Sequence, residues 1–322
     1  MKIETKTSVE LSYVDWETHT ASFNKVFSKH LTVNDFKHKY LNTIDGLSYH
    51  ALLKVENIVV GGLTVIPYEY FIEDSVIRIG LTVDVFITDE HRVDLMSLSK
   101  MYKKIKELLI LRDFTLVITN PNDNAYFYWK KIVKFQDVGH LNYFALPLKI
   151  SNVVSRLPKV LNLFTIIGSK ILLTCSYCFH LNEKVLPIRL NRSNNILETQ
   201  RYTSLHKTRI IKNVFFSYRI VDEDGVNTCY LIDFYNVLKR KKDTYSLRKA
   251  IQNISSIGNI DLIIFVGKLS FFQILLFKVP FKIEPRHLHF MVDIIKPNKI
   301  INSELLYEFK NWDFGLFNYD VR

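Results

Sequence analysis

The alternation of strand and helix patterns in residues 76–148 most constrains the fold of this chain. The stretches 76–88 (VIRIGLTVDVFIT), 114–119 and 141–148 have the composition of strands, and helices are expected at 93–112 and 124–135. In the first of these helices, apolar residues recur at three- and four-residue steps on one face, namely Leu95, Leu98, Tyr102, Ile105 and Leu109. This order predicts an α/β fold with a twisted mixed sheet flanked by helices.

The residues before this region add strands and one short helix. A strand is expected within 6–17 and a helix at 34–42. Residues 48–72 predict two strands separated by a turn at Glu56-Asn57. The pair Gly61-Gly62 inside the second strand predicts a bulge or a close approach of backbone.

The second half partly repeats this order. A hairpin is expected from 214–220 to 226–235, with its turn at Asp224-Gly225. A helix at 243–257 with Asp243 as its N-cap follows. Further elements are expected at 261–267 (strand), 270–277 (helix) and 287–294 (strand). The repetition indicates an internal duplication, with domains at 1–150 and 201–322 and an apolar linker segment at 151–200.

The most apolar stretch is VLNLFTIIGSKILLTCSYCF, residues 160–179. Asn162 and Lys170 interrupt it, and Gly168-Ser169 breaks its middle, so no run reaches the roughly 18 uncharged apolar residues of a spanning helix. We therefore expect a buried helix that joins the two domains and no stable membrane insertion. A segment lying on a membrane surface is the alternative.

The formal net charge of +11 indicates an anionic partner. Nucleic acid, anionic membrane and polyphosphate ligands all fit that charge. The chain shows no helix-turn-helix, zinc finger or arginine-rich arm, which favours a small polyanion over nucleic acid. The densest basic run, Lys239-Arg240-Lys241-Lys242, fits either phosphate binding or a solvated charged loop.

The three cysteines do not form a metal motif. Cys175 and Cys178 have C-x-x-C spacing, but no second such pair and no pair of histidines at ligand spacing accompanies them. Their apolar context predicts buried, unreactive thiols, so no metal is expected. The odd cysteine count and the lack of a recognisable signal peptide predict a cytoplasmic protein.

The turn TDEHRVD, residues 88–94, follows one strand and begins the next helix. Backbone N–H groups at a helix start, together with Arg92, would converge on an anion.

The stretch from Val83 to Leu148 resembles the GNAT (Gcn5-related N-acetyltransferase) superfamily, and the likeness covers most of residues 20–148. Residues 200–322 resemble the second half of tandem GNAT proteins that acylate nucleotide-linked amino sugars such as dTDP-3-amino-3,6-dideoxyhexoses. The resemblance implies an acyl-CoA co-substrate, either acetyl-CoA or 3-hydroxybutanoyl-CoA.

In this resemblance, the family's coenzyme loop falls on residues 92–97, with Arg92 retained and Leu95 and Ser97 replacing two glycines. These replacements leave open a divergent working site or a first half that has lost its coenzyme. The implied coenzyme contacts are the strand backbone and the start of the following helix, together with the family's asparagine and one tyrosine: Val85, Phe86, Ile87, Arg92, Val93, Asp94, Ser97, Asn122 and Tyr126. The position of the family's tyrosine acid falls near Trp129, with Tyr126 and Tyr128 close by, and Lys134 replaces a glycine before Phe135.

Several polar residues are candidates for catalysis or acceptor binding, and each also has a structural interpretation. The catalytic candidates are Asp84, Glu69, His287 and Tyr128. The candidates for acceptor binding are Asp233, His289 and Trp312, with Tyr319 as a further base-stacking residue. Asp84 and Asp233 fit a structural pairing with a backbone group or a lysine about equally well, and the histidines fit a half-exposed strand.

The resemblance implies an N-acyltransferase that transfers an acetyl or 3-hydroxyacyl group to a nucleotide-linked, dTDP-type amino sugar in the biosynthesis of O-antigen or capsule. The amine would attack the thioester directly, while the strand backbone stabilises the oxyanion. The alternatives are an aminoacyl or peptide amine as acceptor, a GNAT-fold binding protein without catalysis, and a nucleic-acid-binding protein. We expect a monomer or a dimer.

Overall fold

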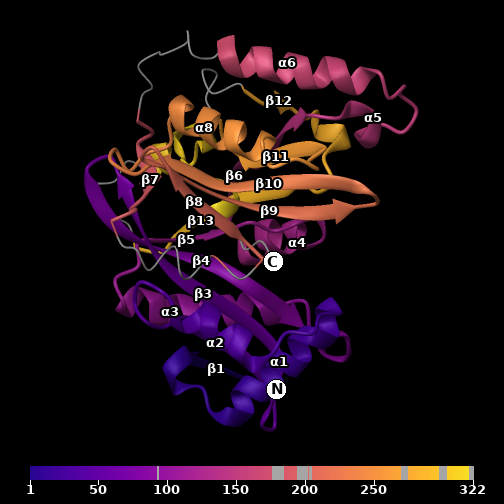
Figure 1. Cartoon of the computed structure of the whole chain (residues 1–322). Helices are drawn as coiled ribbons and strands as arrows, with labels where there is room; N and C mark the ends of the chain where they lie inside the picture. The colour runs from indigo at the N-terminus through magenta and orange to yellow at the C-terminus, as the bar shows by residue number, and fades with distance from the viewer. Residues whose placement is uncertain are drawn as a thin grey trace. The chain divides into compact units, whose positions relative to one another are not determined.

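The computed structural model describes residues 1–92, 94–175, 185–193, 202, 205–269, 275–296 and 303–318 (Figure 1). The chain folds into two compact units, each assembled from three segments. Unit 1 comprises Met1–His140, Pro187–Arg201 and Arg286–Trp312. Unit 2 comprises Leu141–Leu186, Tyr202–Pro285 and Asp313–Arg322. The expected GNAT-like domains at 1–150 and 201–322, with a linker between them, remain a prediction.

Unit 1 contains a mixed sheet in the order β1-β2-β3-β4-β5-β13, with a short strand, β7, paired to β3. Its strands are β1 Lys2–Thr7, β2 Tyr49–Val55, β3 Ile58–Ile72, β4 Ser75–Ile87, β5 Leu116–Thr119, β7 Ile188–Leu190 and β13 Leu288–Ile294. Its α-helices are α1 Tyr13–Phe27, α2 Val33–Leu41, α3 Ser97–Leu111, α4 Asp123–Phe127 and α9 Ser303–Leu306. A π-helix at Tyr128–Val133 continues α4, and 3-10 turns lie at Ser8–Glu10, Asp89–His91 and Phe309–Asn311.

Unit 2 contains a second sheet in the order β6-β11-β10-β9-β8, with β12 also paired to β6. Its strands are β6 Gln136–Pro147 (which begins in unit 1), β8 Lys207–Ile211, β9 Val214–Glu223, β10 Val226–Asn236, β11 Leu262–Gly267 and β12 Phe277–Lys278. Its helices are α5 Ile150–Val153, α6 Leu161–Cys175 and α8 Thr244–Ser255, with 3-10 turns at Phe281–Ile283 and Leu316–Asn318.

The units share one order of elements but exchange one strand. In each, an antiparallel hairpin (β3–β4 or β9–β10) precedes a helix and a strand that pairs in parallel with the hairpin, β5 or β11. The strand after β5 in the chain is β6, which pairs with β11 of unit 2. The strand after β11 that completes a sheet is β13, which pairs antiparallel with β5 of unit 1. The strand expected at 287–294 is therefore present, but it belongs to the first sheet.

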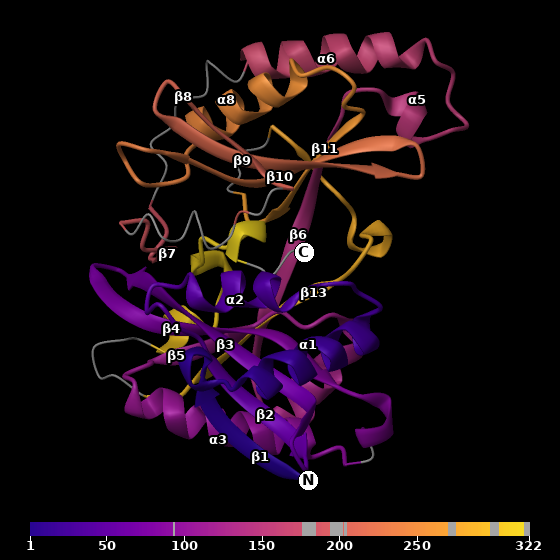
Figure 2. The ribbon, with the colours of Figure 1, turned by 60° about the horizontal axis from the view of Figure 1, so that its bottom comes forward.

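Helices cover both faces of the unit 1 sheet (Figure 2). On one face, α3 packs Met101, Tyr102, Ile105 and Leu109 against β2, β3 and β5. Leu95, expected on this helical face, precedes α3 and is 58% exposed. On the other face, aromatic residues of α1 and α2, among them Phe23 and Phe36, contact Phe86 of β4 or one another.

The strand expected within 6–17 is wrong beyond Thr7, because α1 begins at Tyr13. Ser12 caps this helix by accepting a hydrogen bond from the Asp15 backbone N–H, and the Asp15 carboxylate accepts one from the Ser12 N–H. Trp16, His19 and Phe23 are buried at helical spacing. A helical pattern thus overrides the apparent strand.

The segment 160–179, expected as a buried helix between domains, contains α6, but the prediction that this helix is buried is wrong. The helix lies within unit 2, where Leu172 and Leu173 pack on the core beside α8. Its opposite side is open, with Leu163 58% and Phe164 65% exposed.

Two other features of unit 2 agree with the sequence: the hairpin turn at Asp224-Gly225, with φ of 52° and 84°, and the Asp243 cap on the Ser246 N–H. Most of the helix expected at 270–277 lies outside the described residues.

Candidate active site

The site begins where β4 and β5 part. The parallel register joins Ile79 to Leu116, Gly80 to Val117 and Leu81 to Ile118, whereas β4 continues to Ile87. The last six residues of β4 therefore extend past the pairing with β5. A strand edge of this kind offers backbone N–H and C=O groups to an extended ligand.

A β-bulge shapes β4 at this point. Gly62 pairs with Phe86 and Thr64 with Val83, so Asp84 and Val85 oppose Leu63 alone. Asp84 has φ of 49°, a left-handed conformation that aspartate tolerates better than most residues. A Cβ on Gly62 would lie 2.7 Å from the Phe86 ring, so glycine is required there. The expectation for Gly61-Gly62 is confirmed.

The Asp84 side chain points into unit 1 and forms a buried ion pair. Its Oδ2 accepts hydrogen bonds from Lys39 Nζ at 2.7 Å and from Tyr40 OH at 2.5 Å. The Asp84 side chain is 3% exposed and that of Lys39 8%. His50 lies beside them. Its burial is the main cause, and the charge of nearby His19 the second, that holds the pKa of His50 well below its usual range. These contacts favour the structural role of Asp84, which fixes α2 beneath the bulge.

In the turn after β4, Arg92 and the residues that begin α3 form contacts with nearby residues of the same turn. Arg92 Nε donates to the Ile87 carbonyl at 2.8 Å, and its Nη1 lies 2.7 Å from Asp89. Asp94 accepts from the Met96 N–H at 2.9 Å and from Lys100 Nζ at 2.7 Å. These two bonds lower the pKa of Asp94. A carboxylate of the chain itself thus lies where an anion was expected; Val93 lies outside the described residues.

A second polar cluster lies at the end of β5, where β13 runs beside it. Asn122 caps α4 by accepting from the Ala125 N–H. The next residue, Asp123, contacts His289 Nε2 at 3.0 Å and His287 Nδ1 at 3.1 Å. The bond to His289, followed by the charge of His287, lowers the pKa of Asp123. The carboxylate therefore orients both imidazoles.

Tyr126 extends this cluster. Its ring stacks on that of His289 with centroids 3.9 Å apart. Lys130 Nζ donates to the Tyr126 hydroxyl, which donates to Asp137 Oδ2. Burial opposes ionisation of Asp137, but the bonds from Tyr126 and Lys130 lower its pKa. The result is a connected acid–base group comprising Asp123, Tyr126, Lys130, Asp137, His287 and His289, which we name the β5-end cluster.

The π-helix places the neighbouring aromatic residues. Its wider turn accommodates an extra residue, a geometry common at functional sites. Trp129 points into the core and is 2% exposed, whereas Tyr128 is 37% exposed. The helix ends at Lys134 in a left-handed conformation, φ 71°, which explains why glycine suits this position in the resembled family. Tyr128 is thus an accessible tyrosine two residues along the chain from Tyr126 of the cluster.

Unit 2 repeats the parted strands, but its own chain occupies them. The β10–β11 register ends at Leu231 and Phe265, with a bulge before Asp233. Gly267 forms a bridge with Gly315, the Lys268 N–H donates to the Phe314 carbonyl, and Leu316–Asn318 contacts both strands. A Cβ on Gly267 would lie 2.7 Å from Gly315, so only glycine permits this approach.

The loop between β10 and α8 is basic, unlike its counterpart in unit 1. Lys239 and Arg240 are exposed, and Arg240 has φ of 49°. Lys242 turns inward, 2.9 Å from Asp313 and 3.8 Å from the fully buried Asp233. Asp233 therefore lies in a buried ion pair within unit 2.

Two other expected residues lie away from the parted strands. Glu69 accepts from Asn191 at 3.0 Å, six residues along β3 from Leu63, a separation of roughly 20 Å. Trp312 is fully buried and donates its Nε1 hydrogen to the Leu306 carbonyl, in a core with Tyr70 and Phe290. Tyr319 and Cys178 lie outside the described residues.

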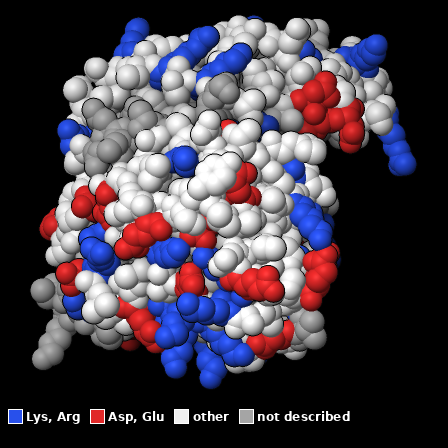
Figure 3. All heavy atoms as spheres, turned by 90° about the horizontal axis from the view of Figure 1, so that it is seen from below, with Lys and Arg blue, Asp and Glu red and all other residues white. Residues whose placement is uncertain are grey.

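Surface charge, metal-ligand groups, helix length and one cysteine can be compared with the sequence expectations. Acidic and basic side chains are interspersed on the face in Figure 3, in contrast to the uniform basic stripe typical of nucleic-acid binding. Among the described residues, no His, Cys, Asp or Glu group is arranged to hold a metal ion. In the same part of the chain, no helix combines the length and apolar character needed to cross a bilayer. The expected burial of Cys175 is wrong, since it is exposed at the end of α6.

Comparison with known proteins identifies structures that share this fold. No family model matches the sequence, and no curated protein matches it. Among solved structures, a GCN5-related N-acetyltransferase from Anabaena variabilis ATCC 29413 matches with a TM-score of 0.58 at 11% identity, over 91% of this chain and 73% of that one. A probable N-acyltransferase from Enterococcus faecalis V583 gives 0.58 at 11%, over 92% and 73%. Saccharomyces cerevisiae N-myristoyltransferase, solved with myristoyl-CoA and inhibitors, gives 0.55 at 10%, over 90% and 80%.

The fold is that of the GCN5-related N-acetyltransferases. The expected α/β class is confirmed, and a likeness that spans about nine tenths of the chain agrees with two units of this kind. Sequence reasoning missed Asp123, Lys130 and Asp137 as members of the β5-end cluster. The spacing of Tyr126 and Lys130, four residues apart, is a local signal that links one of these residues to an expected one.

Proposed function

We propose that this protein is an acyl-CoA-dependent N-acyltransferase whose reaction takes place in unit 1. The observation that carries the proposal is the parting of β4 from β5, with a bulge at Asp84, in a fold shared with N-acyltransferases. The exposed edge of β4 near Val85–Ile87 suits the extended pantetheine arm of a coenzyme A thioester.

The residues present fit this co-substrate in part. The edge of β4 provides backbone donors and acceptors. At the start of α3, Arg92 and Lys100 provide positive charge for a diphosphate, but Asp89 and Asp94 engage them. Binding of a diphosphate there has to displace these carboxylates, which costs affinity.

The β5-end cluster supplies the proton chemistry. Asp123 bonds Nε2 of His289, so Nδ1 is the nitrogen of that ring that faces away from Asp123. Nδ1 accepts a proton from the ammonium group of the acceptor. Tyr128 is the accessible hydroxyl for returning a proton to the departing thiolate. Backbone N–H groups of β4 stabilise the oxyanion formed when the amine attacks the thioester.

For the acceptor, we propose the amine of a nucleotide-linked amino sugar, of the dTDP type, used in surface polysaccharide biosynthesis. The support is the net charge of +11 and the basic loop of unit 2, in which Lys239 and Arg240 are exposed and Lys241 is half-buried; such a loop suits a diphosphate. The internal repeat supports a tandem arrangement in which the second copy binds the acceptor. A peptide amine is the competing acceptor.

The test measures coenzyme binding and thiol release on the full chain. Acetyl-CoA should raise the melting temperature, and a panel of amino sugars, their dTDP derivatives and peptides should identify the acceptor by mass spectrometry. His289→Gln should lower kcat at least about tenfold with little change in coenzyme affinity. Absence of both a thermal shift and thiol release with every amine would leave a binding protein without catalysis.

Two charge variants decide which unit binds the coenzyme diphosphate. Asp94→Asn should tighten acetyl-CoA binding severalfold, because it removes a competing carboxylate, while Asp74→Asn in the β3–β4 turn serves as control. Lys239→Gln with Lys241→Gln should weaken the acceptor and leave acetyl-CoA unaffected. The opposite outcome would assign the coenzyme to unit 2.

A further inference from the structure

Helix α6 is apolar on both of its sides. One side packs into the core of unit 2 through Leu172 and Leu173. The other exposes Leu163, Phe164, Ile167 and Ile171, preceded by Val160, at 58%, 65%, 47%, 57% and 62%. These positions follow the spacing i, i+3, i+4, i+7 and i+11, which places them along one stripe. Figures 1 and 2 both show this helix along the outer side of unit 2.

The apolar surface continues from α6 onto a neighbouring strand. Phe164 and Ile171 line a hollow of about 490 Å³ together with Phe277 of β12, which is itself 61% exposed. The rest of the lining is almost entirely apolar: Leu146, Pro147, Thr165, Gly168, Ser169, Leu172 and Cys175. The two polar hydroxyls already donate, Thr165 to the Leu148 carbonyl and Ser169 to the Ile166 carbonyl. We name this stripe and hollow the α6 surface.

The stretch of chain that forms the α6 surface carries charges of one sign. Residues 138–182 contain no aspartate or glutamate. Within them Arg156, Lys159 and Lys170 are exposed, and Lys278 lies exposed next to Phe277. Apolar side chains bordered by cations match the boundary between acyl chains and anionic headgroups of a bilayer.

We infer that the α6 surface docks on an anionic lipid bilayer, with α6 lying in the plane of the interface. Exposed apolar patches of this extent are uncommon on monomers and mark interaction sites. A second copy of the chain is disfavoured as occupant, since a symmetric contact would bring the same four cations face to face. The hollow accepts the ends of acyl chains beneath the headgroups. This inference does not depend on the proposed transferase activity.

The experiment is sedimentation of the full chain with phosphatidylcholine vesicles and with vesicles containing about one third phosphatidylglycerol. Binding should require the anionic lipid and weaken with salt. Phe164→Glu with Ile167→Glu should reduce partitioning at least about tenfold. Lys159→Gln with Lys170→Gln should reduce it about fivefold per charge on the mixed vesicles.

The matched control is Ile210→Glu in β8 of the same unit, an apolar residue that is 65% exposed but lies away from α6. It should leave partitioning unchanged, and circular dichroism should show all variants folded. Failure to bind the mixed vesicles would overturn the inference. So would an equal loss in the Ile210 variant, or a dimer that dissociates only in the Phe164 and Ile167 variant.

Discussion

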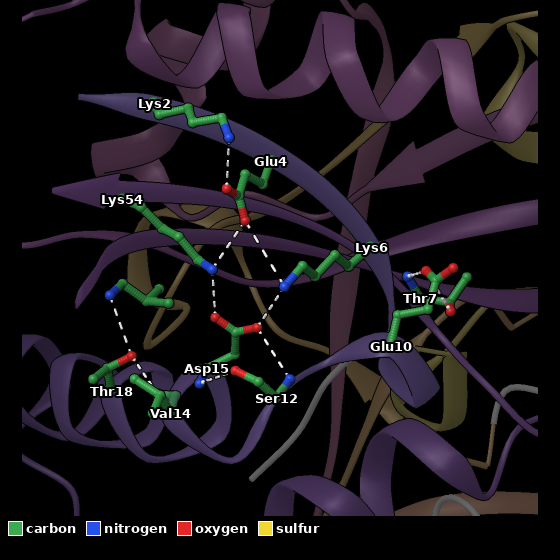
Figure 4. A network of polar contacts seen from close by, with 11 residues as sticks. Lys2, Glu4, Lys6, Thr7, Glu10, Ser12, Val14, Asp15, Thr18 and Lys54 are labelled. Atoms are coloured by element: carbon green, nitrogen blue, oxygen red, sulfur yellow. Dashed lines mark hydrogen bonds and ion pairs between the residues drawn. The ribbon is translucent and has the colours of Figure 1, made fainter. Parts of the chain in front are cut away.

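At the scale of single residues, buried charges decide how the N-terminal helix sits on its sheet. Asp15 of α1 is 1% exposed and contacts Lys6 at 2.7 Å and Lys54 at 2.5 Å (Figure 4). Glu4 of β1 joins the same network through Lys54 at 3.0 Å. Burial opposes ionisation of Asp15, but the bonds from both lysines and from Ser12 lower its pKa far below the usual value. The carboxylate therefore contributes stability only while it is charged.

We predict that Asp15→Asn lowers the free energy of unfolding by about 3 kcal/mol at neutral pH, because Lys6 and Lys54 lose their buried counter-ion and keep only the more exposed Glu4. The folded-state pKa of Asp15 lies below its unfolded value of about 4. Its contribution is thus complete above that value and is lost as pH falls toward the folded pKa. Urea unfolding at several pH values measures this: the gap between wild type and variant should narrow in acid. A gap independent of pH, or one equal to that of the exposed Asp74→Asn, would contradict the assignment.

The cysteines give a second prediction at this scale. Cys229 is fully buried in β10, and burial raises the pKa of its thiol to about 12. Cys175 is exposed at the end of α6. Iodoacetamide at neutral pH should therefore modify Cys175 and leave Cys229 intact until the protein unfolds. Peptide mass mapping before and after denaturation provides the measurement; early labelling of Cys229 would show that unit 2 opens.

At the scale of elements, the π-helix after α4 ends in a conformation that its residue does not favour. Lys134 is exposed and left-handed, with φ of 71°. Left-handed geometry costs a residue with a Cβ roughly 1 kcal/mol, and glycine avoids that cost. The turn brings Phe135 back onto Tyr102 and Trp129, and these contacts offset the cost.

We predict that Lys134→Gly raises the free energy of unfolding by about 1 kcal/mol. Lys131→Gly, at an exposed position inside the π-helix, should lower it by a similar amount, since glycine weakens helical segments. Thermal unfolding of the pair gives the comparison. If both substitutions destabilise the protein, the Lys134 side chain contributes to the free energy of unfolding by more than the cost of its left-handed backbone.

Elements with strong local patterns could be predicted from the sequence, and those fixed by distant contacts could not. Strand β4 and the Asp243 cap follow from alternation and capping chemistry in nearby residues. The capping signal of Ser12 and Asp15 marks the start of α1, but the strand expected within 6–17, although its residues alternate poorly, runs across that signal. The use of the strand backbone near Val85–Ile87 as a coenzyme contact was expected from the family resemblance and stays a prediction. The β5-end cluster was not expected, since Asp123 and His289 meet only when β13 pairs with β5.

At the scale of the whole molecule, the exchange of β6 and β13 ties the two halves of the chain together. Unit 1 lacks its sixth strand until Leu288–Ile294 is present, and unit 2 uses β6 from the first half. Tyr102 and Lys106 of α3 both bond Asp293 of β13, each at 2.7 Å. Each unit is therefore completed by a segment from the other half of the sequence.

We predict that a fragment of residues 1–149 does not fold stably, because the edge of β5 and the partners of Asp293 remain uncovered. The same fragment joined through a glycine-serine linker to residues 286–312 should recover cooperative unfolding and protection from proteolysis. Circular dichroism and limited trypsin digestion make the comparison. Stable folding of the shorter fragment would show that β13 is dispensable for unit 1.

The strand exchange also has a consequence for synthesis on the ribosome. Translation proceeds at about 5–20 residues per second, so the nascent chain carries an incomplete first sheet for many seconds after β5 emerges. During that interval the Leu116–Thr119 edge, fully apolar but for its threonine, is open to pairing with other nascent chains. Production of this protein should therefore respond to chaperone supply and to growth temperature more than its final stability would suggest.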